Sequence, residues 1–166
     1  MNNVSLDEIS IRTELCSGDI GYVIHLHGAL YAKEYGYGLQ FESYVAKGLA
    51  EFYEKYDPER NRAWVCEHKS RMVGSLLLMD RGTAAQLRYF LIEPEYRGIG
   101  LGSKLLRLYM EFLRQRDYKA SYLWTTHELS TAALLYKRLG FQLTEEKEST
   151  AFGKPLREQR YDLVLP

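Results

Sequence analysis

The sequence predicts a mixed α/β fold, in which a central mixed sheet of about seven strands carries helices on both faces. Two observations predict it. Segments with alternating apolar residues and segments with apolar residues at helical spacing follow one another in the order β-α-α-β-β-β-α-β-α-β-β. In the middle of the chain a strand, a helix and another strand form a crossover, which makes those two strands parallel. The length of 166 residues suits a single domain, 1–166.

The first third of the chain is predicted to hold one strand and two helices. Residues 9–15 alternate between apolar and polar side chains, which is typical of a strand. Apolar residues at helical spacing predict a helix over 20–31, after a turn at 17–19 that can cap it. Glycines then interrupt the pattern, and a second apolar stripe predicts another helix over 41–56.

The rest of the chain is predicted to be richer in strands. Short polar turns separate three consecutive strands, which should form an antiparallel meander. In chain order the predicted segments are strands at 63–68, 72–79 and 84–92, a helix at 101–112, a strand at 122–126, a helix at 130–139, and strands at 141–147 and 160–165.

The composition argues against several classes of protein. Basic and acidic residues number 22 each, so the neutral chain offers no charged surface for nucleic acid or an anionic membrane. No signal peptide or apolar run of about 18 residues is present. Cys16 and Cys66 lack metal or redox spacing, and His25 and His27 would point about 200° apart on a helix. We therefore expect a cytoplasmic protein without a metal site.

Three glycines, Gly98, Gly100 and Gly102, alternate with other residues where the strand 84–92 gives way to the following helix. Such a turn leaves backbone N–H groups free at a helix N-terminus, which suits a phosphate or pyrophosphate. A nucleotide P-loop would end in Lys-Ser or Lys-Thr, and 103–104 has the reverse order. The glycine spacing also fails the dinucleotide fingerprint. The alternative is a glycine turn that only starts a helix.

Two segments together resemble the acetyl-CoA-binding core of the GNAT N-acetyltransferases. Arg97, Gly100 and Gly102 form the pattern R-x-x-G-x-G, and residues 132–141 read AALLYKRLGF. The predicted order of elements is also that of the family. More narrowly, residues 18–35 resemble a bacterial subgroup whose members are often fused behind a MarR-type regulator. Because this chain begins at the acetyltransferase part, we expect the DNA-binding half to be absent.

The resemblance implies acetyl-CoA as co-substrate and no metal. The glycine loop would hold the CoA pyrophosphate, and main-chain groups at a bulge in the preceding strand would bind the pantetheine and polarise the acetyl carbonyl. The cofactor-binding residues implied are Phe90, Leu91, Ile92, Arg97, Gly98, Ile99, Gly100, Leu101, Gly102, Ser103, Ser130, Ala133 and Tyr136. One position departs from the family, because Leu129 stands where many members carry Asn, and Ser130 is the candidate to take part of its polar role.

Tyr136 corresponds to the family tyrosine that protonates the departing thiolate, since a phenol is protonated at neutral pH. The alternative is that it is one core aromatic residue among 14 tyrosines. The family reaction is direct attack of an amine on the thioester. The sequence therefore predicts transfer of an acetyl group to a primary amine, on a small molecule or a protein. The alternative is a CoA-binding regulatory module with little or no catalysis. Dimers are frequent among such proteins, so a homodimer is a candidate assembly.

The sequence indicates the residues that would bind the acceptor amine less clearly. The amine must lose a proton to a side chain or an ordered water, and the candidate bases are His27, Glu34, Glu42 and Glu67. The predicted groove residues are His27, Tyr31, Arg88 and Trp124. His27 and Tyr31 also continue the apolar stripe of their helix, and Trp124 suits a core position, so burial is the alternative role. Arg88 lies inside a strand and needs an anionic partner, either a protein carboxylate or a substrate carboxylate.

Overall fold

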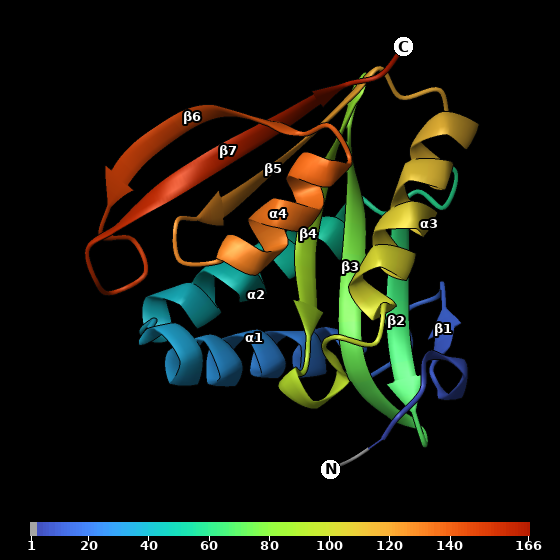
Figure 1. The fold of residues 1–166 in the computed structure, drawn as a ribbon, viewed down its shortest axis with the longest axis horizontal. Coiled ribbons are helices and arrows are strands. Elements are labelled where there is room, and N and C mark those ends of the chain that lie inside the picture. Colours follow the sequence, from blue (N-terminus) through green and yellow to red (C-terminus); the bar gives the residue numbers. More distant parts are fainter. Residues whose placement is uncertain (1–2) are drawn as a thin grey trace.

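A seven-stranded sheet forms the centre of the molecule, with helices on both faces (Figure 1). The computed structural model describes residues 3–166. Its elements are a 3₁₀ turn (Leu6–Glu8), β1 (Ser10–Arg12), α1 (Asp19–Tyr35), α2 (Leu39–Glu54), β2 (Arg62–His68), β3 (Arg71–Arg81), β4 (Ala84–Ile92), a 3₁₀ turn (Pro94–Tyr96), α3 (Leu101–Gln115), β5 (Ala120–Thr126), α4 (Ser130–Arg138), β6 (Gln142–Ser149) and β7 (Leu156–Val164). The spatial order of the strands is β1-β2-β3-β4-β5-β7-β6. The predicted mixed α/β fold and element order are confirmed.

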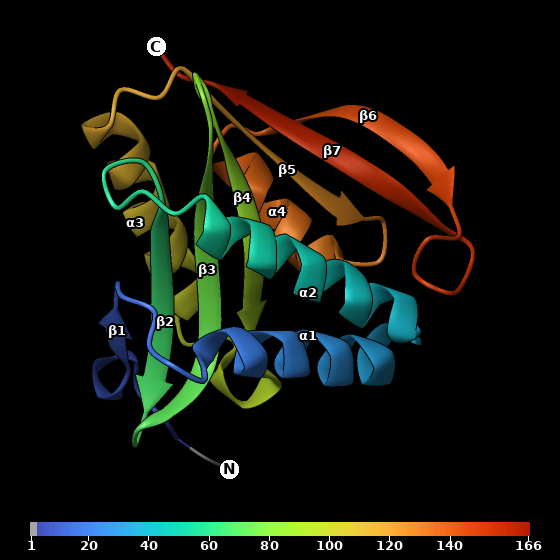
Figure 2. The same cartoon turned by 180° about the vertical axis from the view of Figure 1, so that it is seen from behind.

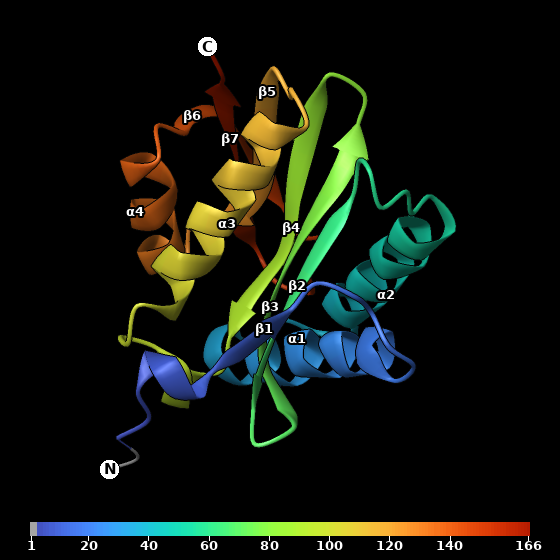
Figure 3. The ribbon, with the colours of Figure 1, turned by 90° about the vertical axis from the view of Figure 1, so that its right-hand side faces the viewer.

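The sheet separates two apolar cores. Helices α1 and α2 cover one face, whereas α3 and α4 cover the other (Figures 2 and 3). Alternate residues of β3 serve the two sides, as the pleat of a strand requires. Leu76 and Leu78 belong to the core under α3 and α4, while Leu77 and Met79 belong to the core under α1 and α2. A central strand buried on both faces explains why its sequence is almost continuously apolar.

The first and last strands have different bounds from those predicted. The strand predicted at 9–15 is limited to Ser10–Arg12, because the chain then turns so that the Arg12 guanidinium can meet both Asp19 and Glu67 at 2.7 Å. The last strand begins at Leu156, earlier than residue 160, because its polar stretch pairs with β5 on one side and β6 on the other.

The two parallel strands of the sheet separate along their length. β4 pairs with β5 only from Ala84 to Gln86, after which β4 stays with β3 and β5 stays with β7. The edge of β4 that faces β5 is therefore unpaired beyond Gln86. This wedge-shaped opening lies at the carboxyl end of β4, where open α/β sheets bind ligands.

The bulge implied by the resemblance is present in β4. Leu77 of β3 pairs with Arg88, but Ser75 pairs with Leu91, so β4 contains one extra residue between these pairs. Tyr89 takes a left-handed backbone conformation there, with φ of 54°. The Ser75 hydroxyl donates a hydrogen bond of 2.8 Å to the Tyr89 carbonyl and thereby satisfies a group that the bulge removes from the ladder.

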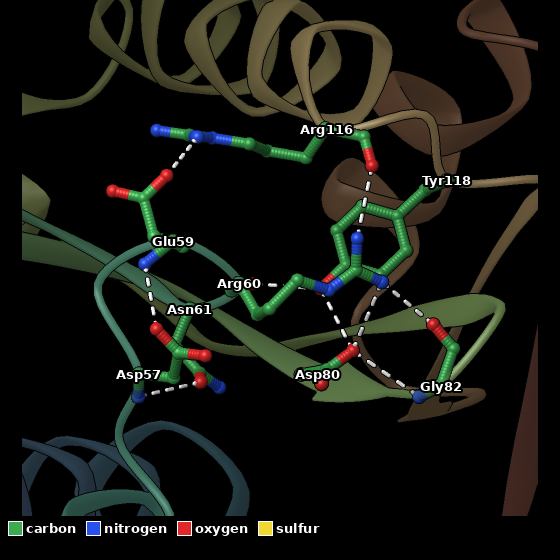
Figure 4. A network of polar contacts seen from close by, with 8 residues as sticks. All are labelled: Asp57, Glu59, Arg60, Asn61, Asp80, Gly82, Arg116 and Tyr118. Carbon is green, nitrogen blue, oxygen red and sulfur yellow. Dashed lines mark hydrogen bonds and ion pairs between the residues drawn. The ribbon is translucent and has the colours of Figure 1, made fainter.

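Arg60 holds together the opposite end of the sheet, where β4 and β5 still pair (Figure 4). Its guanidinium donates to the carbonyls of Arg116 at 2.9 Å and Gly82 at 2.7 Å, and it lies 4.0 Å above the Tyr118 ring. The Tyr118 hydroxyl donates in turn to Asp80 at 2.9 Å. These contacts join the β3–β4 turn to the loop before β5, so the strands separate at the other end alone.

Candidate functional site

Two adjoining pockets open where β4 and β5 separate. The glycine-loop pocket has a volume of about 370 Å³ and is lined by Tyr31, Tyr35, Phe90, Leu91, Ile92, Arg97, Gly98, Gly100, Gly102, Ser103, Glu128, Leu129, Ser130, Thr131, Ala132 and Leu135. The aromatic pocket has a volume of about 100 Å³ and is lined by His27, Tyr31, Tyr37, Phe41, Tyr44, Val45, Gln86, Leu87, Arg88, Tyr89, Phe90, Trp124, Thr125, Thr126, Leu129, Tyr136, Phe152 and Glu158. Tyr31, Phe90 and Leu129 border both pockets, so the two are contiguous.

Two of the three glycines in the loop are required by their backbone conformation. Gly98 and Gly100 have φ values of 77° and 90°, a left-handed conformation that side chains disfavour. Gly102 lies close to the neighbouring side chains, because a Cβ there would be in ordinary contact, at 3.4 Å, with both Phe90 and Leu135. Helix α3 can therefore begin close against β4, with its N-terminus at the pocket.

The loop presents a row of free backbone donors. The N–H of Arg97 donates to the Pro94 carbonyl, and the N–H of Lys104 donates to the Gly100 carbonyl. Between them, the N–H groups of residues 98–103 meet no acceptor within the described chain. Helix α3 adds the positive end of its dipole at the same point. This arrangement suits an anionic group such as a phosphate.

Arg97 adds a positive side chain at the edge of the glycine-loop pocket. Its guanidinium donates two hydrogen bonds to the Glu34 carboxylate, of 3.1 and 2.8 Å, and its Nε donates to the Ile92 carbonyl at 2.9 Å. The pair therefore ties α1 to the end of β4. Glu34, one of the predicted bases, is engaged in this ion pair.

The structure brings most of the predicted cofactor residues to one pocket. Those lining the glycine-loop pocket are Phe90, Leu91, Ile92, Arg97, Gly98, Gly100, Gly102, Ser103 and Ser130. Ile99, Leu101 and Ala133 instead pack with their side chains in or against the core under α3 and α4. The prediction omitted Tyr35, Glu128, Thr131, Ala132 and Leu135. The helical pattern of 130–139 was visible in the sequence, but which of its faces meets the pocket depends on how α4 packs.

Tyr136 lies in the wall of the aromatic pocket, on α4. It is only 4% exposed, and its ring is 6.2 Å from that of Phe90, which borders both pockets. Burial raises the pKa of the Tyr136 hydroxyl above its usual value. The hydroxyl is therefore protonated at neutral pH and can act as a proton donor near the junction of the pockets.

Side chains from distant segments build the aromatic pocket. The Tyr31 ring of α1 stacks on Phe41 of α2 at 5.0 Å, and Phe152 from the β6–β7 loop packs against Phe41, also at 5.0 Å. The Tyr37 hydroxyl lies 2.6 Å from Thr126 Oγ1 of β5, and burial raises the pKa of Tyr37 to about 12. The predicted groove residues His27, Tyr31, Arg88 and Trp124 all line this pocket.

His27 is both a buried residue of α1 and a residue of the aromatic pocket. Its Nδ1 lies 2.8 Å from the Val23 carbonyl, which can only accept, so Nδ1 carries the hydrogen. Burial lowers the pKa of His27 to about 4. At neutral pH the imidazole is therefore uncharged, and its Nε2 has a free lone pair.

The other predicted bases lie elsewhere. Glu67 accepts a hydrogen bond of 2.7 Å from Arg12 near the β1 edge of the sheet, and Glu42 lines neither pocket. Arg88 faces the carboxylate of Glu51 at 4.0 Å. Within residues 3–166, no cluster of three His, Cys, Asp or Glu side chains could hold a metal ion. In that part of the chain, every helix is too short or too polar to cross a membrane.

Comparison with known sequences identifies the family. Residues 29–141 match the model of the Acetyltransferase (GNAT) family. The chain is 34% identical over 98 residues to the uncharacterized N-acetyltransferase YjgM of Escherichia coli (strain K12). The matched region covers 57% of this chain and 59% of that protein. The chain spans about half the length of the curated relatives it matches.

Comparison with solved structures agrees at the level of the fold. An acetyltransferase from Streptococcus agalactiae superposes with a TM-score of 0.75 at 20% identity, covering 95% of this chain and 99% of that one. A GNAT family acetyltransferase from Elizabethkingia anophelis, solved with acetyl-CoA bound, superposes with a TM-score of 0.66 at 15% identity, covering 96% and 99%. From the family match and the shared fold, we conclude that the chain belongs to the GNAT acetyltransferase family.

Proposed function

We propose that the protein is an N-acetyltransferase that moves an acetyl group from acetyl-CoA to a primary amine by direct attack. The observation that carries this proposal is the junction of the two pockets. One pocket offers free N–H groups for an anion, the other is an aromatic cavity, and they meet beside Tyr136 at Phe90. The acetyl-CoA bound to the Elizabethkingia anophelis protein supports the same co-substrate here.

The glycine-loop pocket fits the donor molecule chemically. The N–H groups of residues 98–103 and the start of α3 would hold the pyrophosphate. The unpaired edge of β4 offers main-chain groups to the amides of the pantetheine, as a neighbouring strand would. A backbone N–H near the bulge at Tyr89 would polarise the acetyl carbonyl.

The reaction needs two proton movements. The amine nitrogen forms a bond to the acetyl carbon, the carbon–sulfur bond breaks, and the Tyr136 hydroxyl donates its proton to the departing thiolate. The proton of the amine passes to a side chain or an ordered water. His27 is the predicted base that lines the aromatic pocket, and its Nε2 has a free lone pair for the proton. Its pKa of about 4 makes the imidazole a weak base, which favours an ordered water as the first proton acceptor.

Calorimetric titration with acetyl-CoA, followed by an assay of thiol release with a library of amines, tests the proposal. We expect saturable binding and release of CoA in the presence of an accepted amine. The absence of binding at high micromolar acetyl-CoA would contradict the proposal.

The second candidate function is a CoA-binding regulatory module with little or no catalysis. Leu129 favours it, because this apolar residue borders both pockets at the position where the resemblance to the family implies Asn. Such a module would bind acetyl-CoA but release no thiol with any amine. The same two measurements therefore separate the candidates.

We propose further properties of location, source and partners. A reducing cytoplasm suits the two free cysteines, of which Cys66 is buried. The resemblance over residues 18–35 supports a bacterial acetyltransferase related to those fused to MarR-type regulators. The acceptor amine belongs to a small molecule or a protein, the protein engages neither nucleic acid nor membrane, and a homodimer is the proposed assembly.

A further inference from the structure

We infer that the acceptor amine carries a carboxylate, which Arg88 binds inside the aromatic pocket. The substrate class is then an amino acid or a similar amino carboxylate with an apolar body. This inference rests on the acetyltransferase function proposed above and names the acceptor of the same site.

Arg88 is a buried cation with too few partners. Its side chain is 10% exposed, and its contact with Glu51 spans 4.0 Å, which is too long for a hydrogen bond. The aromatic rings of Tyr89 and Tyr44 lie 4.8 and 5.6 Å from its guanidinium carbon. The contacts found for the guanidinium within residues 3–166 are this long ion pair and the two aromatic rings, with no hydrogen bond among them. A guanidinium has five N–H donors, so a ligand that accepts two of them would complete the site.

Glu51 serves another arginine. Its Oε1 accepts a hydrogen bond of 2.8 Å from Arg81 and lies 3.4 Å from the Lys55 ammonium. The bond from Arg81 is the main reason why the pKa of Glu51 is lowered. One carboxylate thus faces three cations, and the charge of Arg88 is the least well neutralised of them.

A second unpartnered group lies beside Arg88. The Tyr89 hydroxyl is buried and has no hydrogen-bond partner among the described residues. A Cβ added at Gly48 of α2 would overlap this hydroxyl and would lie 2.6 Å from Arg88 Nη2, so both groups lie against the same glycine. Leaving a buried hydroxyl unpaired is unfavourable, because the group has lost its water and gained no partner. A carboxylate with two oxygens could accept from the guanidinium and from the hydroxyl together.

The rest of the pocket selects what the carboxylate is attached to. Its walls are aromatic rings, including Tyr31, Phe41 and Trp124. Arg88 and Glu158 are its charged side chains, one of each sign. A zwitterion with an apolar side chain matches this lining. A polyamine would place several cations beside Arg88 with a single carboxylate to balance them, which is unfavourable.

Matched amines that differ only in the carboxylate test the inference. The pairs are phenylalanine with 2-phenylethylamine, and leucine with 3-methylbutylamine, with spermidine as a polycation. Turnover is measured with acetyl-CoA, and binding is measured by calorimetry with and without CoA. We expect the carboxylated member to be preferred in kcat/KM and affinity by about tenfold or more. Equal or better use of the amine without a carboxylate would overturn the inference.

Variants separate a ligand-binding role of Arg88 from a structural one. Arg88→Gln should abolish the preference for the carboxylated member, whereas Arg88→Lys should keep part of it. Glu51→Gln is the matched control, because it removes the same ion pair but leaves the guanidinium, and it should keep the preference. If Glu51→Gln and Arg88→Gln lose the preference alike, Arg88 is structural and the inference fails.

Failure of this inference is distinguishable from failure of the proposed function. If the protein binds acetyl-CoA but uses both members of each pair equally well, the inference of a carboxylated acceptor fails and the proposed function stands. A protein that does not bind acetyl-CoA contradicts the function, and the calorimetry without CoA still reports whether the carboxylate is recognised. Tyr89→Phe provides an independent check, since it should weaken binding of the carboxylated member while acetyl-CoA affinity stays within about twofold.

Discussion

The glycine-loop pocket and the aromatic pocket adjoin each other but are built in opposite ways. The first relies on backbone: free N–H groups in one short loop, and glycines whose conformation and lack of a side chain expose them. The second relies on side chains from α1, α2, β4, β5, α4 and the β6–β7 hairpin, which only the folded chain brings together. A ligand common to a whole family suits the first design, whereas a ligand particular to one member suits the second.

The largest expected effect concerns Tyr136, which lies in the aromatic pocket beside Phe90, a residue that borders both pockets. Tyr136→Phe removes the proton donor but keeps the ring, so kcat should fall by about 10²-fold or more. The affinity for acetyl-CoA should stay within about twofold. Steady-state kinetics and calorimetry measure the two quantities, and Tyr53→Phe, at an exposed tyrosine of α2, is the control. An unchanged kcat would assign Tyr136 to the core alone.

The next effect is a pH dependence of stability that arises in the aromatic pocket. The pKa of His27 is about 4 in the folded protein against an ordinary 6.5, so the unfolded chain binds the proton more readily between these values. Stability is therefore highest above pH 6.5 and is lost as the pH falls towards 4, by about 3 kcal/mol from this group.

Urea unfolding of the wild type and of His27→Gln between pH 7.5 and 4 measures this loss. The variant should lack the contribution of His27. The difference in the free energy of unfolding between wild type and variant should therefore change by about 3 kcal/mol over this pH range. His25→Gln, at an exposed position of the same helix, should follow the wild type. A pH-independent difference for His27→Gln would show that the folded protein does not hold this imidazole neutral.

A smaller effect is expected in the glycine-loop pocket. Gly100→Ala places a side chain at φ of 90°, which should lower the free energy of unfolding by about 1–2 kcal/mol. It should also weaken acetyl-CoA binding by about tenfold, because a change in the loop backbone at this residue misaligns the free N–H groups. Gly21→Ala is the control, since it lies in a helix with nothing within 4 Å of its Cβ, and should be neutral or slightly stabilising. If acetyl-CoA affinity is unaffected by Gly100→Ala, the loop does not bind the donor.

The smallest effect concerns a hydroxyl of the aromatic pocket. Thr125 Oγ1 is buried without a partner among the described residues, so Thr125→Val should change the unfolding free energy by less than about 1 kcal/mol. Thr126→Val is the matched comparison, because it breaks the 2.6 Å contact with Tyr37 and should cost about 1 kcal/mol. Chemical denaturation measures both. A larger loss for Thr125→Val would indicate a bond that this hydroxyl makes in solution.

The sequence was informative where local rules decide the structure. Helical and alternating periodicity placed the elements, and the spacing of Gly98, Gly100 and Gly102 predicted the turn whose N–H groups are free in the structure. It failed where tertiary contacts decide. Strand β1 ends at Arg12, whose guanidinium meets Asp19 and Glu67, and no alternation of apolar residues reports these contacts. Phe152 joins the aromatic pocket because the β6–β7 hairpin folds over α2, and no spacing in the sequence relates it to Phe41.

The extra residue in β4 has a consequence for how such chains diverge. Without it, strict alternation would give neighbouring residues opposite faces. Here Tyr89 belongs to the core under α1 and α2 and Arg88 faces Glu51 of α2, whereas Leu87 and Phe90 contact the core under α3 and α4. A deletion of one residue at this point would restore the regular ladder and exchange the faces of the residues beyond it. The length of this strand, and not only its composition, therefore sets which side chains line the aromatic pocket.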